Sequence, residues 1–126
     1  MSWVDLVDKN LVGTGHVSKG AILGEDGTVW GKSADLQIGA DECARVAKGF
    51  TNGAALLEAG LTIEGVKYFV LRADNERIIG KKGPNGFFAY KSNKAVTLAL
   101  YQEGVQPEQC SNACGALSDY FKKIQF

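Results

Sequence analysis

The fold of this chain is decided by residues 61–90, which read LTIEGVKYFVLRADNERIIGKKGPNGFFAY. Runs rich in apolar and β-branched residues, typical of short strands, occupy 61–63, 67–73, 76–80 and 86–90. The intervening residues, Glu64-Gly65, Asp74-Asn75 and Gly83-Pro84-Asn85-Gly86, are of the types that favour tight turns. Short strands joined by tight turns pair with their neighbours in sequence, so this stretch predicts a meander of four strands.

Two further segments extend the sheet on either side of the meander. Apolar residues at 20–23 and 28–30 flank Glu25-Asp26-Gly27, and an Asp-Gly pair between apolar runs is a strong hairpin signal. Residues 95–101 are ambiguous by composition, but the turns that flank them and the preceding meander favour a strand. The sequence therefore predicts an α+β protein with about six strands.

Helices are predicted at both ends of the chain. Ser2 and Asp5 have the spacing of a capping box, and Gly13 and Gly15 are expected to end the first helix. Its apolar stripe contains Trp3, Val7, Asn10 and Leu11. The last helix follows Pro107, which suits a first helical turn. Its apolar face is predicted from the alternating spacing of Cys110, Cys114, Leu117, Phe121 and Ile124, with Tyr120 projecting outward beside it.

Two smaller helices are predicted between the first hairpin and the meander. Residues 41–50 have Cys43, Val46, Ala47 and Phe50 on one face, and Asn52-Gly53 ends that helix. Residues 54–59 form a second short helix. No repeat or linker interrupts the sequence, so we expect one domain spanning residues 1–126.

Composition narrows the classes of function. Hydrophobic residues make up 45% and charged residues 22% of the chain, and the formal net charge is zero. A soluble globular monomer is expected, and nucleic acid is disfavoured as a partner because phosphate contacts call for a basic balance. Met1 leads straight into Asp5 and Asp8 without a signal-peptide pattern, so we expect a cytoplasmic protein.

The reactive residues do not indicate catalysis. There is one histidine, His16, and there are three cysteines, Cys43, Cys110 and Cys114. A metal site or a catalytic triad needs several such groups converging, so we expect no enzyme activity, metal or cofactor. Cys110 and Cys114 lie one helical turn apart on the apolar stripe and are expected to fill core space.

Aromatic residues concentrate at the two ends of the chain, where polar residues are usual. Trp3, Trp30, Tyr120 and Phe126 would together form a flat surface with N–H and O–H donors. Such a surface suits a proline-rich segment in the polyproline II conformation. The alternative is that these rings only cement the terminal helices to the sheet.

The chain resembles the profilin family over its whole length. The resemblance is carried by ordered pieces: Ser2-Trp3 with Val7-Asp8, residues 20–30, residues 60–68, the run from Ile79 to Gly86, Gln109-Cys110, and residues 117–120. It implies an antiparallel sheet of six or seven strands, with the N- and C-terminal helices packed together on one face and the smaller helices on the other. One departure is Leu6, at a position where the family often has tyrosine.

The profilin resemblance also implies partners: actin monomers, proline-rich proteins such as formin-type assembly factors, and phosphatidylinositol bisphosphate at membrane surfaces. It implies polyproline binding by Trp3, Trp30, Tyr120 and Phe126, and a cytoskeletal location. Actin contacts are expected at Lys67, Arg72, Lys82, Val105, Gln106 and Ser111. Phosphoinositide contacts are expected at Arg72, Lys81, Lys82 and Lys91.

Other interpretations of the same residues remain open. The basic residues are equally typical of a solvated turn, and the strand residues of an ordinary sheet edge. A sheet between helices also fits a small-molecule sensor domain, which requires a roomy internal pocket. An aromatic platform for single-stranded nucleic acid is the third alternative, and the zero net charge argues against it.

Overall fold

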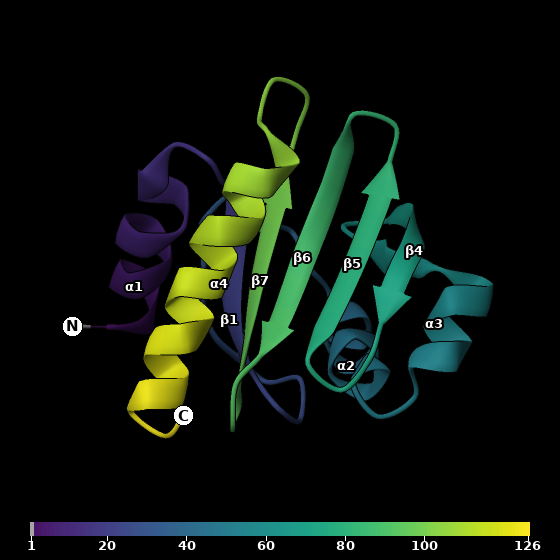
Figure 1. The fold of residues 1–126 in the computed structure, drawn as a ribbon, viewed down its shortest axis with the longest axis horizontal. Helices are drawn as coiled ribbons and strands as arrows, with labels where there is room; N and C mark the ends of the chain where they lie inside the picture. The colour runs from purple at the N-terminus through teal and green to yellow at the C-terminus, as the bar shows by residue number, and fades with distance from the viewer. Residues whose placement is uncertain (1) are drawn as a thin grey trace.

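Seven strands form one antiparallel sheet in a computed structural model that describes residues 2–126 (Figure 1). The strands are β1 (Lys19–Gly24), β2 (Val29–Lys32), β3 (Leu61–Ile63), β4 (Val66–Ala73), β5 (Arg77–Lys82), β6 (Asn85–Lys91) and β7 (Ala95–Tyr101). Their order across the sheet is β2-β1-β7-β6-β5-β4-β3. The helices are α1 (Trp3–Asn10), α2 (Ala40–Gly49), α3 (Gly53–Ala59) and α4 (Pro107–Lys123), and a 3-10 turn covers Val12–Thr14.

The helices cover the two faces of the sheet as the profilin resemblance predicts. In Figure 1, α1 and α4 lie side by side on one face, α2 lies behind the sheet, and α3 lies beside β4 at the edge. Leu56 of α3 packs in the same core as the inner residues of α2. Side chains alternate between the faces of a strand. On β6 this alternation sends Phe87 and Ala89 toward α2 and α3, and Phe88 and Tyr90 toward α4. The sheet is therefore the middle layer between two apolar cores.

The predicted turns form, and side chains hold them. Glu64 and Gly65 both have positive φ, 57° and 74°, and make the two-residue turn between β3 and β4. The Glu42 carboxylate on α2 accepts hydrogen bonds from the backbone N–H groups of Glu64, at 2.8 Å, and Gly65, at 2.9 Å. The smaller helix α2 thus fixes the turn at the edge of the sheet.

The predicted capping box and inner helix faces are confirmed. Asp5 N donates to the Ser2 hydroxyl at 3.1 Å, and the Asp5 carboxylate caps Ser2 N in return. All four residues predicted on the inner face of α2 are buried: Cys43, Val46, Ala47 and Phe50. Pro107 is the first residue of α4.

Two details of the terminal helices differ from the prediction. Asn10 is exposed, and α1 ends there, before Gly13 and Gly15, because the backbone tightens into the 3-10 turn. Ile124 was predicted on the buried face of the last helix, but it lies just beyond α4 and is exposed. The chain turns there, because Phe126 N donates to Phe121 O at 2.8 Å and draws the last residues back against the helix. Within residues 2–126, no helix is long and apolar enough to cross a membrane.

Candidate functional site: an aromatic cluster and an uncovered sheet face

Three aromatic rings from distant parts of the sequence lie in contact at the start of α1. The ring centroids of Trp3 and Trp30 are 4.8 Å apart, and the Phe126 ring lies 5.5 Å from Trp3 and 6.0 Å from Trp30. Their tilted and edge-on geometries are the ones that aromatic pairs favour. Trp3 and Trp30 are half-buried, and 37% of Phe126 is exposed. We call Trp3, Trp30 and Phe126 the aromatic cluster; part of each residue remains accessible to a ligand.

Two glycines allow the tryptophans to meet. A methyl group on Gly31 of β2 would lie 2.8 Å from the backbone carbonyl carbon and the Cβ of Trp3, closer than real Cβ atoms approach. A methyl group on Gly24 of β1 would lie 2.9 Å from the Trp30 indole nitrogen. The first turn of α1 therefore rests directly on the β2 backbone, and the Trp30 ring lies against β1.

The end of the chain is tied to the sheet by its backbone. The Phe126 carbonyl oxygen accepts hydrogen bonds from Lys94 N and, at 2.8 Å, from Ala95 N at the start of β7. These bonds and the one from Phe126 N to Phe121 O fix the backbone on both sides of the ring. An aromatic residue at the end of a chain is thereby held in place in the aromatic cluster, where fraying would otherwise be expected.

Tyr120, the fourth residue predicted for this surface, is connected to the aromatic cluster through Phe121. The Tyr120 and Phe121 ring centroids are 5.8 Å apart, and Phe121 lies 5.8 Å from Trp3. Phe121 is fully buried, whereas Tyr120 is 48% exposed and projects outward as expected. The structure therefore brings all four predicted residues to one region, three of them in direct contact.

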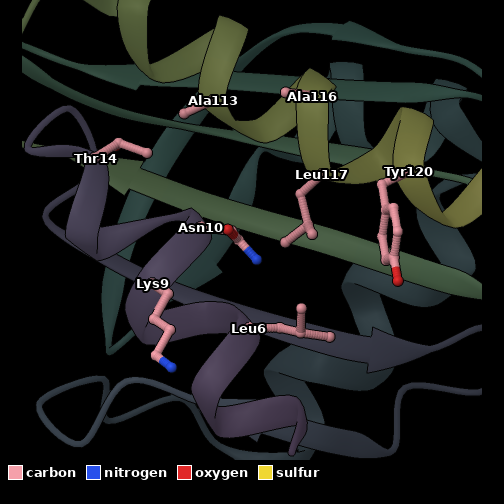
Figure 2. Close-up of a pocket in the computed structure, with 8 residues that line it drawn as sticks. All are labelled: Leu6, Lys9, Asn10, Thr14, Ala113, Ala116, Leu117 and Tyr120. Atoms are coloured by element: carbon pink, nitrogen blue, oxygen red, sulfur yellow. The ribbon is translucent and has the colours of Figure 1, made fainter. Parts of the chain in front are cut away.

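Beyond Tyr120 a groove runs between α1 and α4 (Figure 2). Its volume is about 550 Å³, and it is lined by Leu6, Lys9, Asn10, Thr14, Ala113, Ala116, Leu117 and Tyr120. Figure 2 shows Leu6 and Tyr120 at one end of the groove and Thr14 and Ala113 at the other. The groove is open along the surface, unlike the enclosed pocket that a sensor domain requires.

A second candidate surface lies on the same side of the sheet as α4. The helices α1 and α4 pack on β1, β2, β6 and β7, and Figure 1 shows no helix in front of β4 and β5. On β4, Phe69 is 68% exposed and Leu71 is 55% exposed. Leu71 is the extra residue of a β-bulge, because Val70 pairs with Gly80 and Arg72 pairs with Ile79.

Phe69 and Leu71 are residues that the sequence analysis missed. The sequence carried a partial signal, because residues 68–71 are apolar at neighbouring positions, whereas a strand buried on one face alternates apolar and polar residues. Tyr68 and Val70 fill the core, and Phe69 and Leu71 are left on the outer face. An exposed pair of large apolar side chains beside polar residues is typical of a protein interface.

The residues expected to contact actin lie on or beside β4 and β5, and one of them, Lys82, points to the face opposite Phe69. Lys82 and the loop that contains Val105 and Gln106 lie at the same end of the sheet, because Asn85, the strand partner of Lys82, accepts a hydrogen bond from Glu103 N at 3.0 Å. Lys67 is exposed near the start of β4, and Arg72 lies near the other end of that strand. Val105 is half-buried against the core under α4, which leaves Gln106 as the more accessible of the two.

Ser111 on α4 is engaged in a small polar network. Its hydroxyl shares a short hydrogen bond with the Tyr90 hydroxyl, and the Arg77 guanidinium lies 5.0 Å from the centre of the Tyr90 ring. Burial raises the pKa of Tyr90, and the hydrogen bond with Ser111 opposes this change. The network fixes the position of α4 beside the uncovered strands.

The four basic residues expected to bind phosphoinositides do not form one cluster. Lys81 pairs with Gly86, whereas Lys91 lies five residues farther along β6, which corresponds to roughly 17 Å. The Arg72 guanidinium is bound to Asp74 at 2.7 Å, and Lys91 lies 3.9 Å from Glu25. The strand register places Lys91 at the opposite end of the sheet from Lys81 and Lys82, so the four residues are not side by side.

Lys81 and Lys82 are both exposed, and neither forms a salt bridge within residues 2–126. As neighbours on one strand, they point to opposite faces of the sheet. Lys81 is on the same face as Phe69, its strand partner. The positive charge at this turn is therefore divided between the two faces.

The cysteines lie in the cores. Cys43, Cys110 and Cys114 are buried, and burial raises the pKa of Cys110 to about 12. The Cys114 thiol donates to Thr97 O at 3.2 Å. In the part of the chain that the structure describes, no three His, Cys, Asp or Glu residues gather as metal ligands would.

Comparison with known proteins agrees with this architecture. The family model described as Profilin matches residues 1–126. Profilin-3 of Caenorhabditis elegans is 52% identical over 126 residues, which cover all of both chains. The structure of Acanthamoeba castellanii profilin IA superposes with a TM-score of 0.96 and 38% identity, covering 99% of this chain and 100% of that one.

A more distant structure has the same fold. It is mouse profilin IIa in complex with a double repeat from the FH1 domain of mDia1, with a TM-score of 0.77, 20% identity and full coverage of both chains. At that identity the likeness concerns the fold alone. With the family model, the relatives and the superposition in agreement, the chain belongs to the profilin family.

Proposed function

We propose that this chain is an actin-monomer-binding protein without enzymatic activity, which regulates actin polymerisation in the cytoplasm and holds proline-rich partners on its aromatic cluster. Family membership supports this proposal. The observation that carries it is the contact among the rings of Trp3, Trp30 and Phe126 at an accessible surface. These residues come from both ends of the chain and from β2.

The aromatic cluster has the chemistry that a proline-rich ligand needs. A polyproline II segment is already extended and loses little entropy on binding, and its pyrrolidine rings stack on flat aromatic surfaces. The indole N–H groups of Trp3 and Trp30 and the hydroxyl of Tyr120 are donors for its carbonyl oxygens. The mouse profilin noted above, which has this fold, is in complex with a double repeat from an FH1 domain.

The uncovered face of β4 and β5 is the surface that we assign to actin. Its centre consists of Phe69 and Leu71, with Lys67 and Arg72 around them and Gln106 at the end of the neighbouring loop. Lys82 lies at the same end of the sheet as that loop, but its side chain points to the opposite face. An apolar centre surrounded by charged groups is the usual composition of a protein interface. Because α4 stands between this face and the aromatic cluster, both ligands can be bound together.

Anionic lipid headgroups are a further ligand that we assign to the turn between β5 and β6. Lys81 and Lys82 carry free positive charge there, whereas Arg72 and Lys91 are paired with carboxylates. Each lysine near an anionic membrane contributes about 1 kcal/mol, and the attraction falls off over a Debye length of about 8 Å. The Lys81→Glu/Lys82→Glu variant should therefore no longer bind to vesicles that contain phosphatidylinositol bisphosphate. The Lys91→Glu variant should still bind to them.

The decisive experiment measures both ligands on matched variants. Trp3→Ala should abolish binding to decaproline, which is measured by tryptophan fluorescence. The same variant should leave the affinity for actin monomers unchanged. Phe69→Ala should weaken actin binding about ten-fold or more, the scale of an interface hot spot, and leave decaproline binding unchanged. Leu57→Ala, which truncates an exposed apolar residue of α3 on the other side of the sheet, is the control for both ligands.

The outcomes separate the two assignments. Parallel loss of both activities in a variant that remains folded by circular dichroism would contradict the separation of the two surfaces. Retention of decaproline binding by Trp3→Ala would show that the aromatic rings only cement the terminal helices to the sheet. An unchanged affinity of Phe69→Ala for actin would show that β4 is not part of the actin-binding surface.

A further inference from the structure

A second groove lies between α2 and α3, away from the terminal helices. Figure 1 shows α2 behind the sheet and α3 beside β4 at its edge. The two helices meet at Gly49, where an added methyl group would overlap the Leu56 side chain and lie 2.8 Å from Ile78 Cδ1. Next to this contact α3 presents the short side chains of Ala55 and Ala59, which are exposed. They leave a groove of about 260 Å³, which we call the α2–α3 groove.

The two sides of the α2–α3 groove differ in chemistry. On the α3 side the lining is apolar, with Ala55 and Ala59 beside the buried Leu56. On the α2 side it is polar and positive, with Arg45 and Lys48. Among residues 2–126, no acidic side chain lines the groove. The groove is therefore amphipathic, and its charge has one sign.

The positive side of the groove is available to a ligand. Arg45 and Lys48 are exposed, and neither forms a salt bridge within residues 2–126. They are three residues apart on α2, which corresponds to about 4.5 Å along the helix axis. Asn52 also lines the groove, and its side chain does not cap α3. Guanidinium and ammonium groups only donate hydrogen bonds, so this side of the groove complements carboxylates.

These properties match an acidic amphipathic segment. Carboxylates one helical turn apart on a ligand have the spacing of Arg45 and Lys48, and aliphatic side chains beside them would contact the α3 side. An amphipathic helix in a groove is a common mode of peptide recognition. A membrane surface fits less well, because anionic lipids attract clusters of about four to eight basic residues, whereas two line this concave site.

We propose that the α2–α3 groove binds an acidic amphipathic segment of a partner protein, with its carboxylates on Arg45 and Lys48 and its aliphatic side chains against α3. The proposal adds a class of partner to the proposed function and does not depend on it. No residue that lines the groove belongs to the aromatic cluster or to the residues assigned to actin. The single sign of charge excludes basic segments and so provides specificity.

The test uses three peptides, each with three repeats of four residues. Glu-Leu-Ala-Ala carries both features, Lys-Leu-Ala-Ala reverses the charge, and Glu-Ser-Ala-Ala removes the aliphatic side chains. Measured by calorimetry at low salt, the Glu-Leu peptide should bind about ten-fold or more tightly than the Lys-Leu peptide. It should also bind about five-fold more tightly than the Glu-Ser peptide, because leucine gains apolar contact. Salt should reduce the first ratio, since exposed charges are screened.

Amide NMR shifts locate the bound peptide. The Glu-Leu peptide should shift the amide signals of Gly49 and Gly60, which line the groove at positions without side chains of their own. Shifts confined to the lysines near the end of α4, Lys122 and Lys123, would show unspecific attraction of an acidic peptide and overturn the assignment.

Two variants, each with a matched control, test the two sides of the groove. Arg45→Glu/Lys48→Glu should reverse the preference between the Glu-Leu and Lys-Leu peptides. Lys122→Glu/Lys123→Glu makes the same change in charge at exposed positions on α4 and should preserve that preference. Ala55→Leu should fill the groove and remove the advantage of the Glu-Leu over the Glu-Ser peptide. Ala54→Leu, at the adjacent exposed position outside the lining, should preserve it.

The outcomes separate this inference from the proposed function. Trp3→Ala should bind the Glu-Leu peptide normally, and the groove variants, checked for folding by circular dichroism, should bind decaproline normally. Equal affinity for the three peptides, or a preference that persists in Arg45→Glu/Lys48→Glu, would overturn the inference while leaving decaproline binding untouched. Absence of peptide binding together with self-association that Ala55→Leu abolishes in sedimentation would assign the groove to a second copy of the chain. Binding to phosphatidylserine vesicles that only Arg45→Glu/Lys48→Glu abolishes, again without peptide binding, would assign it to a membrane and overturn the peptide assignment.

Discussion

Replacing Gly31 by alanine should loosen the aromatic cluster by pushing α1 away from β2. The added methyl group would lie 2.8 Å from two atoms of Trp3 and 2.9 Å from Val4 N. Restoring an ordinary contact of about 3.4 Å moves the start of α1 by about 0.6 Å. Overpacking of this kind costs about 1–3 kcal/mol, and the lower chain entropy of alanine offsets about 0.4–1 kcal/mol. We expect a net loss of about 1–2 kcal/mol in the free energy of unfolding.

The assay is urea denaturation followed by circular dichroism and by tryptophan fluorescence. The chain has two tryptophans, Trp3 and Trp30, and both are in the aromatic cluster, so the native emission spectrum reports on this contact directly. Gly31→Ala should shift that spectrum and weaken decaproline binding several-fold.

The matched control is Gly115→Ala on α4. Its added methyl group would meet the nearest Tyr90 ring carbon at 3.5 Å, an ordinary contact, and alanine favours a helix interior over glycine by about 0.5–1 kcal/mol. The two variants should therefore change the stability in opposite directions. A Gly31→Ala protein as stable as its parent, with unchanged fluorescence, would refute the close approach of α1 and β2 as the basis of the cluster.

Four further predictions follow from individual contacts. Two backbone N–H groups and Arg72 lower the pKa of Asp74 to about 2, so its carboxylate stabilises the fold above about pH 4 and this contribution is lost toward pH 2; NMR titration should show that Arg72→Ala raises the pKa only in part. Glu42→Ala should lower the free energy of unfolding by about 1–3 kcal/mol in urea melts, because it leaves the donors of the β3–β4 turn without their carboxylate. Ser118→Ala should raise the melting temperature, because the buried Ser118 hydroxyl has no hydrogen-bond partner within residues 2–126. A lower melting temperature would contradict this prediction, because it would mean that the hydroxyl does form a stabilising hydrogen bond. Cys110 should be alkylated far more slowly at pH 8 in the native chain than in urea, since its raised pKa and burial suppress the thiolate.

Much of the secondary structure was predictable because its causes are local. The capping residues Ser2 and Asp5, the Asp26-Gly27 turn and Pro107 at the start of α4 act through contacts within a few residues of the chain. The resemblance to profilins predicted the layering of the helices, which the structure confirms. Ile124 was the exception, since its spacing fits the helical stripe but a turn of the terminal residues removes it from the helix.

From the sequence alone one could identify the residues proposed for the site, which are aromatic residues concentrated at the two ends of the chain and lysines at one turn. The sequence did not determine which of them meet. The packing of α1 on β2 and the tie of Phe126 to β7 bring the rings together, and the strand register separates Lys91 from Lys81 and Lys82.

The second candidate surface, on β4 and β5, is a product of tertiary packing. The apolar run 68–71 shows that both faces of this strand carry apolar residues, but it does not tell which pair is buried. Phe69 and Leu71 are exposed because α1 and α4 cover β1, β2, β6 and β7 and leave β4 and β5 free. Burial on the second face of a strand depends on where a distant helix comes to rest, and that position is set by contacts between segments far apart in the chain.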